Sequence, residues 1–339
     1  MAKKIIAVWD LGATKCAVGL VEFDSVDESF YCLRDTTLYL NEFFSLEDLT
    51  SGLENNLGIN FSEVDRILIA GAGIYDGQFL NLANGFPYPM PFAHLAASRD
   101  WPEMTVVHDY VPIICSTFIA DLMDEQQVQF IHAGKFDPQG RRVVFGLGTG
   151  LGFKDGVLLQ QKHFWLGSNE IGHMGVCAPP CALPSEIQLH EEFMQFLRTH
   201  TDFSKNQPIT FEKILSGQGT SRIHQFVTAA KQHLLPHEVG DLLRAGEAQE
   251  TMALLAWYLG LLIGTLQLMF MPSGGIWMTG GVLLKHADVV KHPNLKQGMQ
   301  ASPAYLGERK RFPLVLMKEK NLIFLGGAYY MAYNKHSFW

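Results

Sequence analysis

Two aspartates each close a short apolar run that has the length of a buried strand. Asp10 follows the run Ile5–Trp9, and Asp109 follows the run Met104–His108. Polar groups at the carboxyl ends of strands in an α/β sheet face the crevice where ligands bind. An ordinary aspartate is ionised at about pH 7, so it can accept a proton or face a divalent cation. The alternative for Asp109 is an N-cap of a helix that begins at Tyr110.

Two glycine-rich turns each separate a pair of apolar runs: Gly12-Ala13-Thr14 and Gly148-Thr149-Gly150. Backbone N–H groups of residues without Cβ atoms can approach phosphate oxygens, and a threonine hydroxyl adds a donor. Asp10 beside the first turn would repel phosphate unless Mg²⁺ lies between them, and Mg²⁺ binds one or two carboxylates together with phosphate oxygens and water. The alternative for each turn alone is an ordinary tight turn with glycines at positive φ.

The two best-known phosphate-binding signatures are missing from the chain. The pattern Gly-x-x-x-x-Gly-Lys-Ser/Thr does not occur, and the run that begins Gly71-Ala-Gly73 has Asp76 where the dinucleotide fingerprint needs its third glycine. These differences exclude a P-loop and a simple dinucleotide-binding fold.

The composition excludes several classes of protein. Of the 339 residues, 47% are hydrophobic and 18% are charged, and the formal net charge is −8. This length predicts about two domains, and an acidic chain with few charges argues against disorder, nucleic-acid binding and unaided membrane binding. The five cysteines are widely spread, and Asp10 and Lys15 interrupt the apolar start before an export signal could form. We therefore expect a reducing, cytoplasmic location.

The order of apolar runs and turns predicts an α/β fold with a duplicated β-ribbon. The first ribbon covers Ile5–Val21 and the second covers Arg142–Leu159, each with a glycine-rich turn between two strands. From Ser185 onward the pattern is mainly helical. A last strand at Gly275–Met278 leads into a glycine pair, and a helix is expected at 322–333.

Six motifs, taken in order, resemble the bacterial glucokinase family, which belongs to the superfamily of sugar kinases, actin and heat-shock chaperone ATPases. They are Asp10-x-Gly-x-Thr14, His108-Asp109, Gly148-Thr-Gly-Leu-Gly152, Asn169-Glu170-Ile-Gly-His173, Leu215-Ser216-Gly217 preceded by Glu212, and Thr279-Gly280-Gly281. The resemblance implies a two-domain α/β actin-like ATPase (ribonuclease H-like) fold with a cleft between the domains. It places a small domain over 1–112, with the C-terminal helix at about 322–339 packing back on it, and a large domain over 113–321.

The same resemblance implies ATP-dependent phosphorylation of a hexose, with glucose favoured, at its 6-hydroxyl. Asp109 would be the general base, and Asp10 would bind Mg²⁺ through water. The phosphates of ATP would lie against Gly12, Thr14, Gly148, Thr149 and Gly150, and the adenosine against Gly280 and Gly281. The sugar would be held by Asn84, His108, Asp109, Glu170, His173 and Glu212, whose side chains can accept or donate hydrogen bonds to hydroxyls. A homodimer is also expected.

Departures from the family pattern leave the sugar open. His108 stands where glucokinases usually carry asparagine, Ala13 and Ile171 replace glycines, and the segment Leu80–Gly85, with Asn84, differs as well. One alternative is therefore a kinase for another hexose, such as fructose, an amino sugar or an N-acetylated hexosamine. A second is a catalytically silent, sugar-sensing protein, although both aspartates and both turns are retained.

Three further patterns receive structural interpretations. Cys177 and Cys181 after His173 resemble part of a zinc site in the related repressor/open-reading-frame/kinase (ROK) family, but a four-ligand site would need another partner such as His190. We expect both cysteines to be ordinary small apolar residues. The run His190-Glu-Glu is predicted to lie on the solvated face of an amphipathic helix, and Arg309-Lys-Arg311 on a solvated loop.

One uncharged stretch, Met252–Met271, is 20 residues long and could cross a bilayer by length alone. The order of motifs instead places it just before the last strand of the large domain, where a central helix is covered on most sides. Gly260 and Gly264 stand four residues apart and would allow close backbone contact on one face. We expect a buried core helix.

Overall fold

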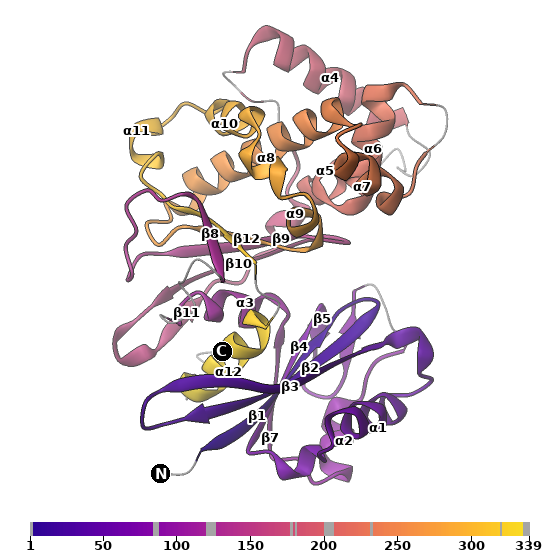
Figure 1. The fold of residues 1–339 in the computed structure, drawn as a ribbon, viewed down its shortest axis with the longest axis vertical. Helices are drawn as coiled ribbons and strands as arrows, with labels where there is room; N and C mark the ends of the chain where they lie inside the picture. Colours follow the sequence, from indigo (N-terminus) through magenta and orange to yellow (C-terminus); the bar gives the residue numbers. More distant parts are fainter. Residues whose placement is uncertain are drawn as a thin grey trace. The chain divides into compact units, whose positions relative to one another are not determined.

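The computed structural model describes residues 3–83, 88–119, 127–176, 179, 182–199, 207–230, 233–318 and 321–334. The chain divides into two compact units (Figure 1). Unit 1 contains Met1–Gln127, Leu159–Phe164 and Glu319–Trp339, and unit 2 contains Val128–Leu158 and Trp165–Lys318. The division therefore falls later along the chain than residue 112, where the sequence suggested it.

Unit 1 is built on a five-stranded sheet in the order β3-β2-β1-β4-β7. The strands are β1 (Lys4–Leu11), β2 (Lys15–Asp24), β3 (Ser29–Tyr39), β4 (Arg66–Gly71) and β7 (Glu103–His108), with a small separate hairpin of β5 (Gly73–Tyr75) and β6 (Leu80–Leu82). The first three strands are antiparallel, whereas β4 is parallel to both β1 and β7. The carboxyl ends of β1, β4 and β7 therefore lie at one edge of the sheet.

Alternation of side chains along β1 explains how both faces of this sheet are covered. Trp9 packs in the cluster formed with α1 and α2, where its ring centroid lies 5.1 Å from that of Phe61. Val8 packs on the opposite face in the cluster that contains Phe324 of α12. Figure 1 shows α12 and α3 on this second face.

The helices of unit 1 are α1 (Leu46–Leu57), α2 (Phe92–Ser98), α3 (Tyr110–Ser116) and α12 (Leu322–Tyr333), with short 3-10 turns η1 (Leu40–Glu42), η2 (Phe61–Glu63) and η4 (Gln160–Lys162).

Two glycines let α12 pack closely in unit 1. A Cβ atom on Gly326 would lie 1.9 Å from the carbonyl oxygen of Pro112 in α3, and one on Gly327 would lie 2.4 Å from Cγ1 of Val8 in β1. Real side chains do not tolerate such distances, so the close approach requires glycine. The last helix of the chain thus packs on the sheet formed by its first residues.

Unit 2 repeats the strand arrangement of unit 1. Its sheet has the order β11-β10-β9-β12-β13-β8, in which β9 and β10 form an antiparallel hairpin and β12 runs parallel to β9. The strands are β8 (Val128–His132), β9 (Arg142–Leu147), β10 (Leu151–Leu158), β11 (Phe164–Leu166), β12 (Ile276–Thr279) and β13 (Leu314–Met317). A hairpin followed by a parallel neighbour thus occurs in each unit, which confirms the duplicated ribbon predicted from the two glycine turns.

Most helices of unit 2 gather on one side of its sheet (Figure 1). They are α4 (Pro184–Thr199), α5 (Phe211–Leu215), α6 (Gly217–Thr228), α7 (Pro236–Ala245), α8 (Gln249–Phe270), α9 (Gly281–Lys285), α10 (Pro293–Gln300) and α11 (Leu306–Arg309), with 3-10 turns η5 (Ile171–His173) and η6 (Ala287–Lys291).

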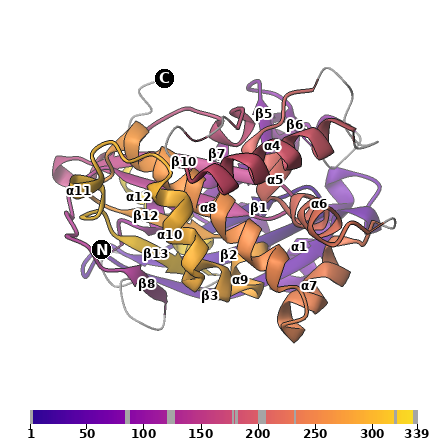
Figure 2. The same ribbon diagram turned by 90° about the horizontal axis from the view of Figure 1, so that it is seen from above.

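Helix α8 contains the long apolar stretch and forms the centre of unit 2. Within the described part of the chain it is the one helix long and apolar enough to cross a membrane, and 72% of its most apolar window is buried in the protein. A Cβ atom on Gly260 would lie 2.0 Å from the carbonyl oxygen of Leu295, and one on Gly264 would lie 2.7 Å from that of Met299. Both glycines therefore let α10 pack closely on α8, and Figures 1 and 2 show the two helices side by side.

Arg309 contradicts the predicted solvated loop, because its side chain is only 1% exposed. Its Nη2 donates to the carbonyl oxygen of Met299 at 2.6 Å, and its Nη1 donates to the carbonyl oxygens of Ser302 and of Ala304, the latter at 3.2 Å. Its Nε donates to Oε1 of Gln267 in α8 at 3.2 Å. The guanidinium satisfies carbonyl groups at and beyond the C-terminal end of α10, a position where positive charge is favourable.

We expect Arg309→Met to lower the free energy of unfolding by about 3 kcal/mol, because buried carbonyl groups lose a charged donor. Urea unfolding of the two proteins would measure the difference. The matched control is Arg311→Met, since Arg311 is 53% exposed and forms a surface ion pair with Glu308 at 2.8 Å. That change should alter stability by less than about 0.5 kcal/mol. Equal shifts for both variants would contradict the role given to Arg309.

Candidate functional site

The two predicted aspartates lie at the same edge of the unit 1 sheet, on either side of β4. Asp10 is in register with Ala70 of β4, and the backbone N–H of Asp109 donates to the carbonyl oxygen of Gly71 at 3.2 Å. Burial and the negative charge of Asp109 raise the pKa of Asp10 to about 6, although Lys15 acts in the opposite direction. The negative charge of Asp109 therefore disfavours ionisation of the neighbouring Asp10, whose carboxyl group is largely shielded from water.

Asp109 precedes α3 but does not cap it with its side chain. Nδ1 of His108 lies 2.9 Å from Oδ1 of Asp109, and the same nitrogen accepts a hydrogen bond from the backbone N–H of Tyr110 at 3.3 Å. Both side chains are partly exposed, at 29% for His108 and 23% for Asp109. The N-cap alternative for Asp109 therefore lacks its defining hydrogen bond, and an imidazole lies beside the predicted base.

The first glycine turn joins β1 to β2 directly after Asp10. The N–H of Gly12 donates to the carbonyl oxygen of Lys15 at 3.0 Å, and Thr14 accepts from the N–H of Leu40 at 3.0 Å. Thr14 is exposed, and a Cβ on Gly12 would make only an ordinary contact. Asn84, the predicted sugar ligand from the β5–β6 region, lies outside the described residues.

The second glycine turn joins β9 to β10 and is bonded to the segment that carries Glu212. The N–H of Gly148 donates to the carbonyl oxygen of Gly150 at 2.9 Å, and the N–H of Gly217 donates to that of Gly148 at 2.9 Å. Oε2 of Glu212 accepts from the N–H of Leu151 at 3.1 Å. The alternative of glycines at positive φ is wrong for both turns, because neither Gly12, Gly148 nor Gly150 has a positive φ.

Gly280 and Gly281 follow β12 at the base of the second turn. Gly280 has a φ of 95°, and a Cβ on it would lie 2.4 Å from the carbonyl oxygen of Leu147, the last residue of β9. A Cβ on Gly281 would meet no atom within 4 Å, and the same holds for Gly148. Gly280 therefore allows close backbone packing, whereas the space beside Gly148 and Gly281 is open.

Glu170 and His173 flank the 3-10 turn η5, and both are exposed. The N–H of His173 donates to the carbonyl oxygen of Glu170 at 3.1 Å. Gly172 lies against β10, since its Cβ would be 2.5 Å from the carbonyl oxygen of Leu151. The N–H of Phe211 donates to the carbonyl oxygen of Met174 at 3.2 Å. The structure thus brings the segments with Glu170, His173 and Glu212 together beside the start of β10.

A buried carboxylate that the sequence analysis missed supports this region. Asp155 in β10 is completely buried and accepts from Nε and Nη2 of Arg141 at 2.8 and 2.5 Å. Its other oxygen accepts from Nδ2 of Asn169 at 2.7 Å, which anchors the residue before Glu170. Burial of a carboxylate requires such partners. The sequence did contain a sign of this buried group, because Asp155 stands inside the otherwise mainly apolar run 153–158.

The suggested zinc site gains no support from His190. Cys177 and Cys181 lie outside the described residues. His190 is 4% exposed and its Nδ1 lies 3.0 Å from the hydroxyl of Tyr258, so the prediction of a solvated position was wrong for this residue. Burial lowers its pKa and favours the neutral imidazole. Among the described residues, three or more histidine, cysteine, aspartate or glutamate side chains do not gather as a metal-binding group.

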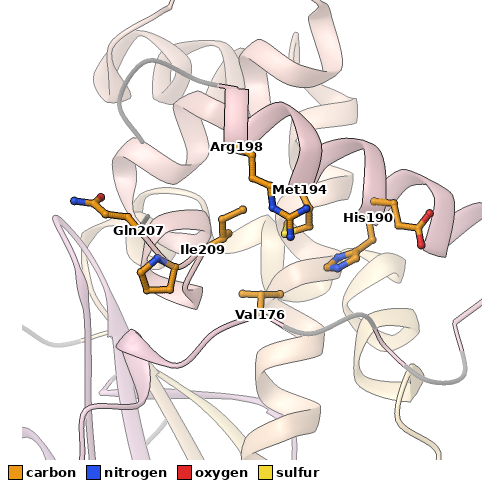
Figure 3. Close-up of a pocket in the computed structure, with 8 residues that line it drawn as sticks. Val176, His190, Met194, Arg198, Gln207 and Ile209 are labelled. Atoms are coloured by element: carbon orange, nitrogen blue, oxygen red, sulfur yellow. The ribbon is translucent and has the colours of Figure 1, made fainter. Parts of the chain in front are cut away.

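A separate pocket of about 440 Å³ lies beside α4 (Figure 3). Figure 3 shows His190, Met194 and Arg198 of α4 together with Gln207 and Ile209 around it. The residues that line it include none of the predicted ATP or sugar ligands. The pocket is therefore distinct from the surroundings of the second turn.

Comparisons with known proteins identify the family and the fold of the chain. A family model described as Glucokinase matches residues 7–334. A glucokinase-like protein from Xylella fastidiosa is 27% identical over 286 residues, which are 81% of this chain and 78% of the relative. The crystal structure of glucokinase from an Antarctic psychrotroph superposes with a TM-score of 0.77 at 21% identity, covering 96% of this chain and 98% of the other. Glucokinase from Balamuthia mandrillaris in complex with glucose has a TM-score of 0.75 at 18% identity, covering 98% and 94%.

Proposed function

The chain belongs to the glucokinase family, and from this premise we propose that it transfers the γ-phosphoryl group of ATP to the 6-hydroxyl of glucose. It is a sugar kinase, an ATP-dependent phosphotransferase, with the actin-like ATPase fold. The observation that carries the proposal is the pair of carboxylates, Asp10 and Asp109, at one sheet edge directly beside a glycine turn.

Asp109 is proposed as the general base that takes the proton from the 6-hydroxyl as it attacks the γ-phosphorus. Its side chain is partly exposed and does not cap α3, and its buried Oδ1 accepts no hydrogen bond within the described structure. The carboxylate is therefore not committed to a structural hydrogen bond and can serve a substrate hydroxyl. A general base supplies about 10²–10⁴-fold in rate, and the rest of phosphoryl transfer is positioning and charge neutralisation. The imidazole of His108 at 2.9 Å restricts the orientation of the carboxylate.

Asp10 is the residue proposed to hold Mg²⁺ through water, and its surroundings fit this role. Asp109 adds a second negative charge, and among the described residues Lys15 is the cation that lowers the pKa of Asp10. Within the described residues no hydrogen bond to its side chain is found. A divalent cation here would supply the missing positive charge and neutralise charge that develops on the phosphates.

The remaining groups divide between ATP and sugar. For the phosphates we propose the two turns, through Gly12, Thr14, Gly148, Thr149 and Gly150, and for adenosine Gly280 and Gly281. For the sugar hydroxyls we propose Asn84, His108, Asp109, Glu170, His173 and Glu212. We further propose that the enzyme is a homodimer in the cytoplasm, where ATP is available.

His108 favours a second candidate within the same reaction, in which the preferred sugar is another hexose or an N-acetylated amino sugar. Its Nδ1 lies 2.9 Å from Oδ1 of Asp109 and accepts from the N–H of Tyr110 at 3.3 Å, so this nitrogen is already occupied within the protein. A ring nitrogen presents one donor or acceptor, whereas the amide of the family's usual asparagine presents both. The change therefore alters which hydroxyl pattern is matched.

A panel of hexoses in a coupled ADP-release assay tests both candidates. We expect the highest kcat/KM with glucose, and we expect His108→Asn to shift the ratio between glucose and an N-acetylated hexosamine by up to about tenfold, the scale of one hydrogen bond. A higher kcat/KM for another sugar would replace glucose by that sugar. Failure to phosphorylate any member of the panel would contradict the proposed function and favour the catalytically silent alternative.

A further inference from the structure

We propose that Glu212 is a positioning residue that couples the sugar to the second glycine turn, so that sugar binding prepares this turn for the phosphates of ATP. The inference rests on the proposed function, which assigns Glu212 to the sugar. It gives the same carboxylate a second role, which is to hold the second glycine turn, and the contacts that support this role all lie within unit 2.

The first observation is the direct contact between Glu212 and the turn. Oε2 of Glu212 accepts from the N–H of Leu151 at 3.1 Å, and a Cβ on Gly150 would lie 2.6 Å from the same oxygen. A side chain at position 150 would therefore displace the carboxylate of Glu212 from its place on the turn. Because Oε2 is bonded to the end of the turn, Oε1 is the oxygen that can accept from a sugar hydroxyl.

The second observation is that the whole α5–α6 junction is tied to the same turn. The N–H of Gly217 donates to the carbonyl oxygen of Gly148 at 2.9 Å. The N–H of Ser216 donates to the carbonyl oxygen of Glu212 at 3.0 Å, and Oγ of the buried Ser216 caps α6 by accepting from the N–H of Gly219 at 3.2 Å. Glu212 and Gly217 thus hold both ends of the turn from one short hydrogen-bonded segment.

The third observation links this junction to the other proposed sugar residues. The N–H of Phe211, next to Glu212, donates to the carbonyl oxygen of Met174, next to His173, at 3.2 Å. Gly172 packs against the carbonyl group of Leu151, the residue whose N–H is bonded to Glu212. The segment with His173, Glu212 and the turn therefore share a single connected set of contacts.

The negative charge of Glu212 explains why the sugar should strengthen ATP binding and not weaken it. An ionised carboxylate beside a turn that must receive phosphates repels them, and the repulsion is strong where water is partly excluded. A sugar hydroxyl that donates to Oε1 withdraws part of this charge and fixes the carboxylate on Leu151. ATP should consequently bind more tightly once the sugar is present, and by reciprocity the sugar should bind more tightly with ATP.

Calorimetric titration with a non-hydrolysable ATP analogue, with and without saturating glucose, measures this coupling. In the wild-type protein we expect glucose to lower the Kd of the analogue by about fivefold or more. In Glu212→Gln the amide oxygen still accepts from the N–H of Leu151, but the charge is gone, so the analogue should bind more tightly without sugar. The ratio of the Kd without glucose to the Kd with glucose should therefore fall below about twofold. Gly150→Ala, which forces Glu212 off the turn, should also abolish the ratio and serves if Glu212→Gln does not fold.

The matched control is His173→Gln, a proposed sugar residue that makes no side-chain hydrogen bond to the turn in the described structure. It should weaken glucose binding and leave the ratio at the wild-type value. A wild-type ratio near one, or an unchanged ratio in either Glu212→Gln or Gly150→Ala, would overturn the coupling while the kinase assignment stands. Failure of the proposed function is seen separately, as absence of sugar phosphorylation by the wild-type protein.

Discussion

Asp109→Asn is expected to lower kcat for the hexose by about 10²–10⁴-fold, the contribution of a general base. The amide has nearly the same shape as the carboxylate, and it keeps an oxygen that can accept from a sugar hydroxyl. The backbone bond from the N–H of Asp109 to Gly71 is unaffected by the substitution. Binding of glucose, measured by calorimetry, should therefore change by less than about tenfold while turnover collapses.

The control for this variant is Asp100→Asn in the same unit. Asp100 is exposed and has a φ of 49°, a backbone conformation that asparagine also adopts readily. Its substitution should leave kcat and glucose binding unchanged. A near-normal rate for Asp109→Asn would remove Asp109 as the base, whereas an equal loss of rate and of sugar binding would give it a binding role alone.

Asp10→Asn is expected to make the protein more stable and less active. The pKa of Asp10 is raised to about 6, mainly by burial and then by the charge of Asp109. Between about pH 4 and pH 6 the folded protein therefore keeps a proton that the unfolded chain has lost, so stability falls as pH rises through this window. Above it the ionised carboxyl costs up to about 3 kcal/mol, which the neutral amide avoids.

Thermal unfolding at a series of pH values measures the stability effect. Without nucleotide, Asp10→Asn should have the higher Tm at pH 7.5, and the difference should disappear below about pH 4, where Asp10 is protonated in both states. Loss of a carboxylate that holds Mg²⁺ through water should weaken metal binding about 10–100-fold, seen as a higher Mg²⁺ concentration for half-maximal rate. A lower Tm at pH 7.5, or an unchanged Mg²⁺ requirement, would contradict this assignment.

Local patterns in the sequence were sufficient for the duplicated ribbon and for several of the strands and helices. Strand alternation and the glycine turns depend on neighbours close in the chain, and the observed β1–β2 and β9–β10 hairpins lie where those patterns predicted them. The apolar stretch was likewise identified as a core helix, because the order of the motifs places it just before the last strand of the large domain, and the close contacts of Gly260 and Gly264 agree with this. The family was evident from six motifs in order, and the family model confirms it.

Local sequence patterns did not predict which polar side chains are buried or which groups they contact. Arg309 follows a glutamate in a basic run, which is typical of a solvated loop, and only the fold brings the carbonyl groups at the end of α10 around its guanidinium. His190 belongs to a polar run, and its partner Tyr258 is 68 residues away. In both cases the cost of burying a polar group is met by distant partners that spacing along the chain does not reveal.

What the sequence determined by itself was therefore the repeated ribbon, the helices, the family and the residue types available for phosphoryl transfer. Only the tertiary structure decided how those residues depend on one another. It places Asp10 where Asp109 acts on its pKa, and it places Glu212 on the turn that contains Gly150. The physical reason is that hydrophobic periodicity is a local property of the chain, whereas electrostatic and hydrogen-bond partners are set by distances in space.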